Sequence, residues 1–334
     1  MNPSPVYLDN NATTALLPEV RGAMEPFLST CYGNPSSPYA FARPASRALA
    51  RAREQVAALA GVTPERLVFT AGGTESNNLA LHAALTARPE RRHLIVTAVE
   101  HASVLEPALA WARHGIRLTV LPVSSDGALD LAALEESLDD TTALVSVMAA
   151  NNETGVCFPL ESVRAMAQRV GAWLHTDAVQ VAGKQEPPSA DLVTLCAHKL
   201  HGPKGAGALV VPAGLRAHPL LAGGEQEAGW RAGTENVAAL AGFGAAAVPG
   251  SLRMDWASRR EAMERAVLAR IPESWVIGAG QPRLPNTSLF CFAGVDTEAL
   301  LARLDLAGFC CSSGSACAAG AHEPSHVLKA MGWV

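Results

Sequence analysis

Residues 67–98, "LVFTAGGTESNNLALHAALTARPERRHLIVTA", decide the fold that we predict for this chain. A short apolar run leads through a glycine turn into a helical stretch, and a second short apolar run follows. The alternation continues with "IRLTVLPV" before "LDLAALEESL", "ALVSVMAA" before "LESVRAMAQRV", and then "AWLHTDAV". Short apolar runs that alternate with helices indicate a mostly parallel sheet covered by helices on both faces. The predicted fold class is therefore α/β.

The pattern changes after about Pro249. A charged helical segment, "RMDWASRREAMERAVLARI", is followed by shorter apolar runs and by the cysteine-bearing "FCCSSGSACAAG". We predict a large sheet domain over residues 15–248 and a smaller α+β domain formed by residues 1–14 and 249–334.

Composition excludes several classes of function. The 334 residues are 49% hydrophobic and carry a formal net charge of -5, so we expect a globular protein with no direct nucleic-acid ligand. The N-terminus has no basic segment leading into an apolar one, and no apolar stretch is long enough to cross a bilayer, so we expect a cytoplasmic protein without membrane contact. The seven cysteines lack the paired spacing of a zinc site, so we expect no metal, and most cysteines, including Cys310 and Cys311, should be buried.

Ligands of parallel sheets collect where the strands end. After the first apolar run, Gly73 and Thr74 begin a helix whose free N–H groups would suit a phosphate, although on this motif alone a plain helix cap is the better explanation. His101 follows the next run, and alone it would be read as a packing histidine. Asn152 lies in a turn that needs no function, and Asp177 could simply cap a helix.

Lys199 is harder to explain structurally. It lies in "TLCAHKLHGPKGAGALVV", residues 194–211, between two apolar runs. Loss of hydration lowers the pKa of a lysine and makes its neutral amine a nucleophile for an aldehyde, with which it forms a Schiff base. The structural alternative is a lysine whose ammonium reaches water. A phosphate site, a histidine ring, a carboxylate and a nucleophilic lysine at the ends of one sheet together favour pyridoxal phosphate.

The chain resembles the class V, fold-type I pyridoxal-phosphate enzymes, and among them the cysteine desulfurases of the nitrogen-fixation and iron–sulfur-assembly type. Nine motifs occur in the family's order: "YLDNNATT", "YGNPSS", "TAGGTESNN", "VEHASV", "NNETG", "HTDAVQ", "AHKLHGPKGAGAL", "RAGTENV" and "SSGSAC". The resemblance implies a large sheet domain with a smaller α+β domain, and a homodimer that takes L-cysteine and passes sulfur to an acceptor protein.

The resemblance also implies roles for residues of this sequence. Lys199 would bind the cofactor covalently and move protons, Asp177 would keep the pyridine nitrogen protonated, and His101 would stack on the ring as a general acid or base. Gln180 and Asn152 would approach the ring hydroxyl and the substrate. The phosphate would be held by Gly73, Thr74 and His198, by Cys196, and by Thr234 of the partner subunit.

Cys317 is the nucleophile that the resemblance implies. Small residues surround it in "SSGSACAAG", which predicts an exposed loop where a thiolate could form. Its thiolate would attack the γ sulfur of L-cysteine, giving L-alanine and a Cys317 persulfide.

Three positions depart from the family pattern. Cys196 stands where a phosphate-binding serine is common, and a thiol is a weaker donor. Tyr39 replaces the usual histidine after "GNPSS". The family continues into an Ile-Arg-x-Ser segment whose arginine holds the substrate carboxylate, whereas this sequence ends at Val334, so we expect a truncated form, another carboxylate-binding group or impaired turnover. Lys329 would be a poor substitute for that arginine.

Other functions remain open on the sequence alone. Within the same fold these are a selenocysteine lyase and a class V aminotransferase, which would not need Cys317. A truncated scaffold without turnover is the alternative outside catalysis, although retention of Lys199, Asp177, His101 and Cys317 argues against it. A pure sulfur carrier would not need the lysine.

Overall fold

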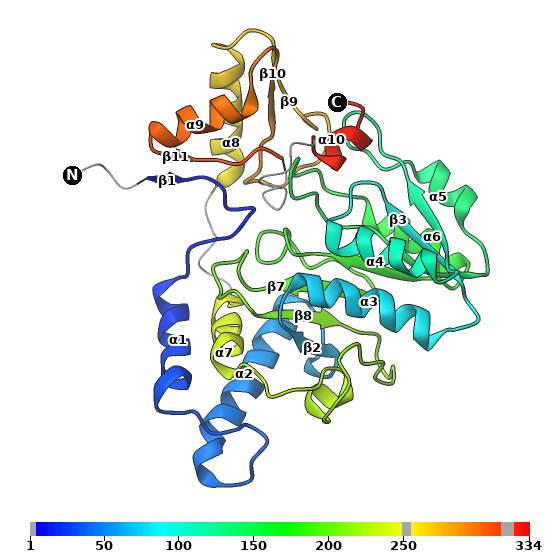
Figure 1. Cartoon of the computed structure of the whole chain (residues 1–334), viewed down its shortest axis with the longest axis vertical. Helices are drawn as coiled ribbons and strands as arrows, with labels where there is room; N and C mark the ends of the chain where they lie inside the picture. Colours follow the sequence, from blue (N-terminus) through cyan, green and yellow to red (C-terminus); the bar gives the residue numbers. More distant parts are fainter. Residues whose placement is uncertain (1–4, 249–254, 315–323) are drawn as a thin grey trace.

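The computed structural model describes residues 5–248, 255–314 and 324–334. Its centre is a seven-stranded sheet, which the middle of the chain builds (Figure 1). In spatial order the strands are β2 (Leu67–Thr70), β8 (Gly207–Val210), β7 (Leu192–Cys196), β6 (Trp173–Asp177), β5 (Thr142–Ser146), β3 (His93–Thr97) and β4 (Arg117–Leu121). Strand β8 is antiparallel to both neighbours, and the other pairs are parallel. The prediction of a mostly parallel α/β sheet is confirmed.

Helices cover both faces of this sheet because its strands are apolar on both sides. In β3, Leu94 and Val96 belong to one buried cluster while Ile95 belongs to the other. Side chains alternate across a strand, so each cluster marks one face. One face packs against α3 (Gly73–Ala87) and α4 (Ala102–Arg113), and the other against α2 (Arg43–Leu59), α6 (Leu160–Arg169) and α7 (Val237–Ala246). A shorter helix, α5 (Leu131–Ser137), lies against β4.

Helix α7 lies against α2 and α1 (Pro18–Ser29), and glycines allow this close packing. A Cβ on Gly242 would lie 2.7 Å from Met24 Cγ, and one on Gly244 would lie 2.7 Å from Ala52 Cα. Our sequence analysis did not identify these three helices. Helix α7 is buried nearly all round, so it has no polar face from which a helical period could be recognised.

The smaller part of the structure joins the two ends of the chain. Strand β1 (Val6–Tyr7) pairs in parallel with β11 (Phe309–Cys310), and β9 (Ser274–Val276) pairs antiparallel with β10 (Phe290–Phe292). Helices α8 (Trp256–Leu268) and α9 (Thr297–Leu306) accompany these strands in Figure 1. The pairing of β1 with β11 supports an N-terminal contribution to this part, and the boundaries at residues 14 and 249 stay a prediction.

The C-terminal helix α10 (His326–Ala330) attaches to the large sheet region. Its Val327 and the following Met331 belong to the same buried cluster as α2 and α7. Trp333 Nε1 donates to the carbonyl of Ser125 at 2.7 Å. Lys329 lies on α10 and is exposed. Three single turns of 3-10 helix complete the described elements: η1 (Ala40–Ala42), η2 (Pro64–Arg66) and η3 (Gln226–Gly229).

The expectation that most cysteines are buried was wrong. Of the six cysteines in the described segments, Cys196 is buried, Cys310 is partly exposed and Cys311 is exposed. Cys310 ends the short strand β11 and Cys311 follows it, and among the described strands β11 pairs only with the two residues of β1, so little sheet covers these two cysteines. Within the described segments, no helix is long and apolar enough to cross a membrane, and no cluster of three metal-binding side chains occurs.

Candidate active site

The carboxyl ends of the parallel strands gather the predicted residues at one edge of the sheet. Gly73 follows β2, His101 follows β3, Asn152 follows β5, Asp177 ends β6 and Lys199 follows β7. Parallel neighbours end at the same edge, so these residues approach one another although they span more than a hundred positions of the chain.

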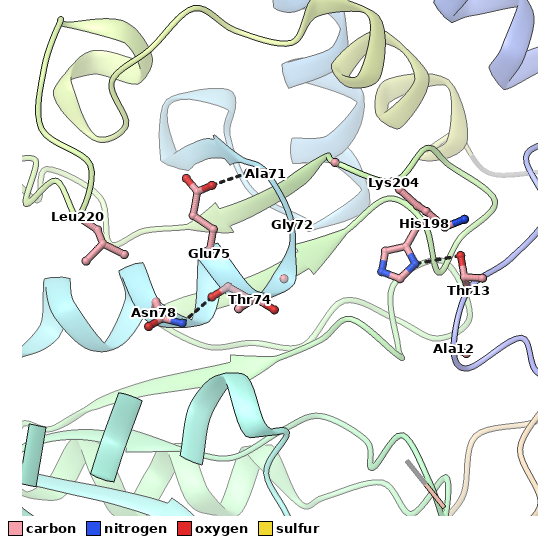
Figure 2. A pocket seen from close by; sticks show the side chains of 12 residues that line it. Ala12, Thr13, Ala71, Gly72, Thr74, Glu75, Asn78, His198, Lys204 and Leu220 are labelled. Carbon is pink, nitrogen blue, oxygen red and sulfur yellow. Dashed lines mark hydrogen bonds between the residues drawn. The ribbon is translucent and has the colours of Figure 1, made fainter. Parts of the chain in front are cut away.

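A pocket of about 760 Å³ opens at the start of α3. Figure 2 shows the first turn of α3 on one side of it and His198 with Lys204 on the other. Its lining residues are Ala12, Thr13, Ala71, Gly72, Gly73, Thr74, Glu75, Asn78, His198, Lys204, Gly205 and Leu220. Helix N–H groups that face the ammonium of Lys204 and the ring of His198 make this pocket suitable for an anion.

The turn before α3 is fixed by a close backbone approach. A Cβ on Gly207 of β8 would lie 2.6 Å from the Cα of Gly72, so only glycine fits at this position. Glu75 holds the same turn from outside: its Oε2 accepts from the N–H of Ala71 at 2.9 Å, and its Oε1 accepts from Arg231 Nε at 3.0 Å. The helix start is therefore held rigidly before any ligand binds.

The N-terminal segment supplies one wall of the pocket. Thr13 Oγ1 lies 3.2 Å from His198 Nδ1, and the N–H of Thr14 donates to the carbonyl of His198 at 2.9 Å. Burial, together with Lys199 and Lys204, lowers the pKa of His198 to about 4. His198 is therefore a neutral ring at physiological pH that donates through a single N–H.

Asp177 is a buried carboxylate with a partner for each oxygen. It is 9% exposed at the end of β6. Its Oδ2 accepts from Asn77 Nδ2 at 2.8 Å, and its Oδ1 accepts from the N–H of Val179 at 3.0 Å. These donors fix the orientation of the carboxylate, and a carboxylate in this position can pair with a protonated ring nitrogen.

His101 forms the N-cap of α4. Its Nδ1 accepts from the backbone N–H of Ser103 at 3.1 Å and lies 2.8 Å from Ser103 Oγ. Burial lowers the pKa of His101, Asp177 opposes this shift, and Lys199 and His326 add to it. Hydrogen bonds through Ser103 and Asn77 join His101 to Asp177, and the charge of Lys199 also acts on the ring.

Asn11 connects the next two predicted residues. Gln180 Nε2 donates to the carbonyl of Asn11 at 3.1 Å, and Asn11 Nδ2 donates to the carbonyl of Asn152 at 3.0 Å. Lys184 Nζ lies 3.5 Å from Gln180 Oε1. Burial and the neighbouring Lys199 lower the pKa of Lys184 to about 8.

Of the predicted residues, Gly73, Thr74 and His198 line the pocket, and the others in the described segments lie outside its wall. Cys196 is buried, and burial raises the pKa of its thiol to about 12. Thr234 is exposed and follows Arg231, which binds Glu75 at the pocket. Tyr39 is exposed before η1. Cys317 lies outside the described residues.

Four residues of the site were not predicted individually from the sequence, although the quoted motifs contain them: Asn11, Thr13, Asn77 and Ser103. The run "DNNATT" contains the first two, and its polar composition without any period was the available signal. Asn77 lies inside α3, and Ser103 lies in the first turn of α4. Asparagine and serine are ordinary at such positions, so nothing in the sequence pattern distinguished these two residues.

Known proteins share both the sequence and the fold. The aminotransferase class-V family model matches residues 6–333. A cysteine desulfurase of Nostoc sp. is 47% identical over 338 residues, covering 98% of this chain and 84% of that protein. A cysteine desulfurase of Klebsiella pneumoniae is 45% identical over 335 residues, with 98% and 84% covered.

Solved structures agree with these relatives. A NifS-like protein superimposes with a TM-score of 0.90 at 33% identity, covering 99% of this chain and 90% of that one. A structure described as SspA in complex with cysteine gives a TM-score of 0.86 at 31% identity, with 98% and 94% covered. The chain belongs to the aminotransferase class-V family and, within it, to the cysteine desulfurases.

Proposed function

We propose that this desulfurase binds pyridoxal phosphate at the strand-end site and moves the sulfur of L-cysteine onto Cys317. The observation that carries the proposal is the placement of His101, Asp177 and Lys199 at the ends of strands whose common edge also forms an anion pocket. The solved relative described as being in complex with cysteine supports the choice of substrate.

The residues present fit pyridoxal phosphate. The helix start at Gly73 and Thr74, with the neutral ring of His198, suits its phosphate. The carboxylate of Asp177 suits its ring nitrogen, and the amide of Gln180 suits its hydroxyl. Cys196 is buried behind this site rather than on the pocket wall, so we assign the phosphate to the other residues first.

Bound pyridoxal phosphate supplies an electron sink for the substrate's α carbon. Lys199 would hold the cofactor through its amine, and that amine would also take the α proton and return protons to the product. Asp177 would pair with the ring nitrogen through a carboxylate that Asn77 and Val179 hold in place. His101, whose pKa is lowered by burial, would approach the ring as an imidazole.

The sulfur step balances without an added oxidant. The thiolate of Cys317 attacks the γ sulfur, the S–S bond forms, and the Cβ–S bond breaks with its electron pair left on carbon. A proton then completes the methyl group of L-alanine, and Cys317 carries the persulfide. A sulfur-acceptor protein, in iron–sulfur cluster assembly or another sulfur pathway of the cytoplasm, then receives this sulfur.

We place the enzyme as a homodimer in which Thr234 of one subunit completes the phosphate site of the other. Two observations support this. Thr234 is exposed close to the pocket wall, and an apolar group formed by Leu28, Tyr32 and Phe41 is exposed on the surface near α1. The rings of Tyr32 and Phe41 contact each other at 4.9 Å between centroids, so they present one joined apolar surface.

Alanine formation tests the proposal. The purified chain with pyridoxal phosphate, L-cysteine and a reductant should release alanine, and Lys199→Ala and Cys317→Ser should each abolish it. The matched control is Cys311→Ser, because burial and Asp9 raise the pKa of Cys311 and keep it a thiol. Alanine released equally by Cys317→Ser would contradict the persulfide route and favour a lyase that cleaves the Cβ–S bond without Cys317, whereas an aminotransferase would convert L-cysteine to its keto acid.

A further inference from the structure

A continuous chain of hydrogen bonds joins His101 to Asp177. Asp177 Oδ2 accepts from Asn77 Nδ2 at 2.8 Å. The same Nδ2 donates to Ser103 Oγ at 2.8 Å, and Ser103 Oγ lies 2.8 Å from His101 Nδ1. Asn77 is fully buried and Ser103 nearly so, so the chain is shielded from water over its middle.

The direction of each bond in this chain follows from its ends. A carboxylate only accepts, so the amide of Asn77 must turn its nitrogen toward Asp177. Both N–H groups of Asn77 are then used, and its Oδ1 is buried without a hydrogen-bond partner. The reversed amide would place this oxygen against the carboxylate, which is worse than leaving it unpaired.

The hydroxyl of Ser103 therefore acts as a hydrogen-bond donor toward the imidazole of His101. Ser103 Oγ accepts from Asn77, so its own hydrogen is directed to His101 Nδ1. The backbone N–H of Ser103 also donates to this nitrogen. With Nδ1 an acceptor of two donors, the proton of the neutral ring lies on Nε2.

We propose that Ser103 and Asn77 are positioning residues that hold His101 in the Nε2–H tautomer through one chain of hydrogen bonds that ends on Asp177. This inference deepens the proposed function, on which it rests for the roles of His101 and Asp177. It assigns His101 as a hydrogen-bond donor through Nε2. Taking up a proton at Nδ1 would require breaking both bonds from Ser103, so His101 is not the general base, and Lys199 takes that part.

The tautomer can be read by nitrogen NMR of the protein labelled with ¹⁵N-histidine. The two ring nitrogens of a neutral histidine give distinct signals, and His101→Gln identifies those of His101 by their loss. At pH 8, with and without pyridoxal phosphate, we expect the signal pair of an Nε2–H ring. Ser103→Ala should shift the His101 Nδ1 signal and lower kcat roughly tenfold, and Ser103→Thr should restore both.

The chain offers a matched control. Ser146 Oγ lies 2.8 Å from Nδ1 of His175, another buried histidine of the same sheet. Ser146→Ala should shift the signals of His175 and leave those of His101 unchanged. Asn77→Leu should act on His101 in the same direction as Ser103→Ala, since it removes the donor that orients the serine hydroxyl.

An Nδ1–H signal for His101 in the parent protein would overturn the inference, and so would unchanged His101 signals in Ser103→Ala. The spectra are recorded without substrate, so a wrong tautomer contradicts this inference alone. Absence of alanine formation with the expected tautomer would instead contradict the proposed function.

Discussion

At the scale of single residues, the site depends on buried polar groups, most of whose atoms are hydrogen-bonded. Asp177 has a donor for each oxygen, and His198 is kept neutral by burial and by two lysines. Glu100, one residue before His101, is completely buried, and its Oε1 accepts from Thr97 Oγ1 and from the N–H of Met148. Burial raises the pKa of Glu100 to about 8.

We predict that Glu100→Gln flattens the dependence of stability on pH. With a pKa of about 8 in the folded protein against 4.5 when exposed, the stability due to protonated Glu100 is complete below pH 4.5 and is lost as pH rises to about 8. The loss is at most roughly 4–5 kcal/mol. Thermal unfolding between pH 5 and pH 8.5 should show that the melting temperature of Glu100→Gln rises relative to that of the parent as pH increases. Melting temperatures that change in parallel with pH would contradict this.

We predict that Asp177→Asn keeps the fold but lowers kcat roughly 100-fold or more, because a neutral amide cannot hold a positive charge on the ring nitrogen. Steady-state kinetics and circular dichroism measure the two effects. Asp191→Asn is the control: its Oδ2 accepts from the N–H of Leu174 at 2.9 Å, which places it at the other end of β6. An equal loss of kcat in both variants would mean a structural effect only.

At the scale of elements, the start of α3 is shaped by strand β8. Because β8 lies beside β2, Gly207 pairs with Thr70 and approaches the backbone of Gly72. The anion pocket therefore depends on a glycine in a neighbouring strand as much as on the helix itself. Figure 2 shows this helix start, with Gly72 and Thr74 facing the pocket.

We predict that Gly207→Ala weakens cofactor binding at least about tenfold and destabilises the protein by roughly 1–3 kcal/mol, because the added Cβ displaces the turn at Gly72. Titration of the cofactor's visible absorption and chemical unfolding measure both. Gly22→Ala is the matched control, since Gly22 lies inside α1 with open space around it. That change should add roughly 0.5–1 kcal/mol of stability and leave cofactor affinity unchanged.

At the scale of the whole molecule, the N-terminal segment brings distant parts together. Strand β1 pairs with β11, and the residues that follow it contact both Asn152 and Gln180 at the sheet edge. In the expected dimer, Thr234 would likewise contact a distant part of the site, in this case the phosphate site of the other subunit.

We predict that inactive subunits complement one another. Lys199→Ala removes the amine, and Thr234→Asp places a negative charge against the phosphate, so each homodimer should be inactive when cofactor is limiting. If Thr234 serves the other subunit, a mixed dimer has one intact site, and random exchange should recover roughly a quarter of the parent activity. No recovery, with exchange verified by mass, would place Thr234 in its own subunit's site or outside both.

Prediction from sequence succeeded where structure is local. The strands β2 to β8 and the helices α3 to α6 followed from short apolar runs and helical periods, and the residues after each run proved to be neighbours. Helix α7 was missed because it is apolar on all sides. The exposure of Cys311 was missed because an apolar run does not reveal how little covers a two-stranded edge.

Local patterns in the sequence indicated the strands of the large sheet, the helices between them and the chemical groups that follow the strands, because these depend on near neighbours along the chain. Only the tertiary structure decided that β8 enters antiparallel between β2 and β7, and that Asn77 and Asp177, a hundred positions apart, share a hydrogen bond. Strand order and such pairings are set by the joint packing of many distant side chains, which no local pattern records.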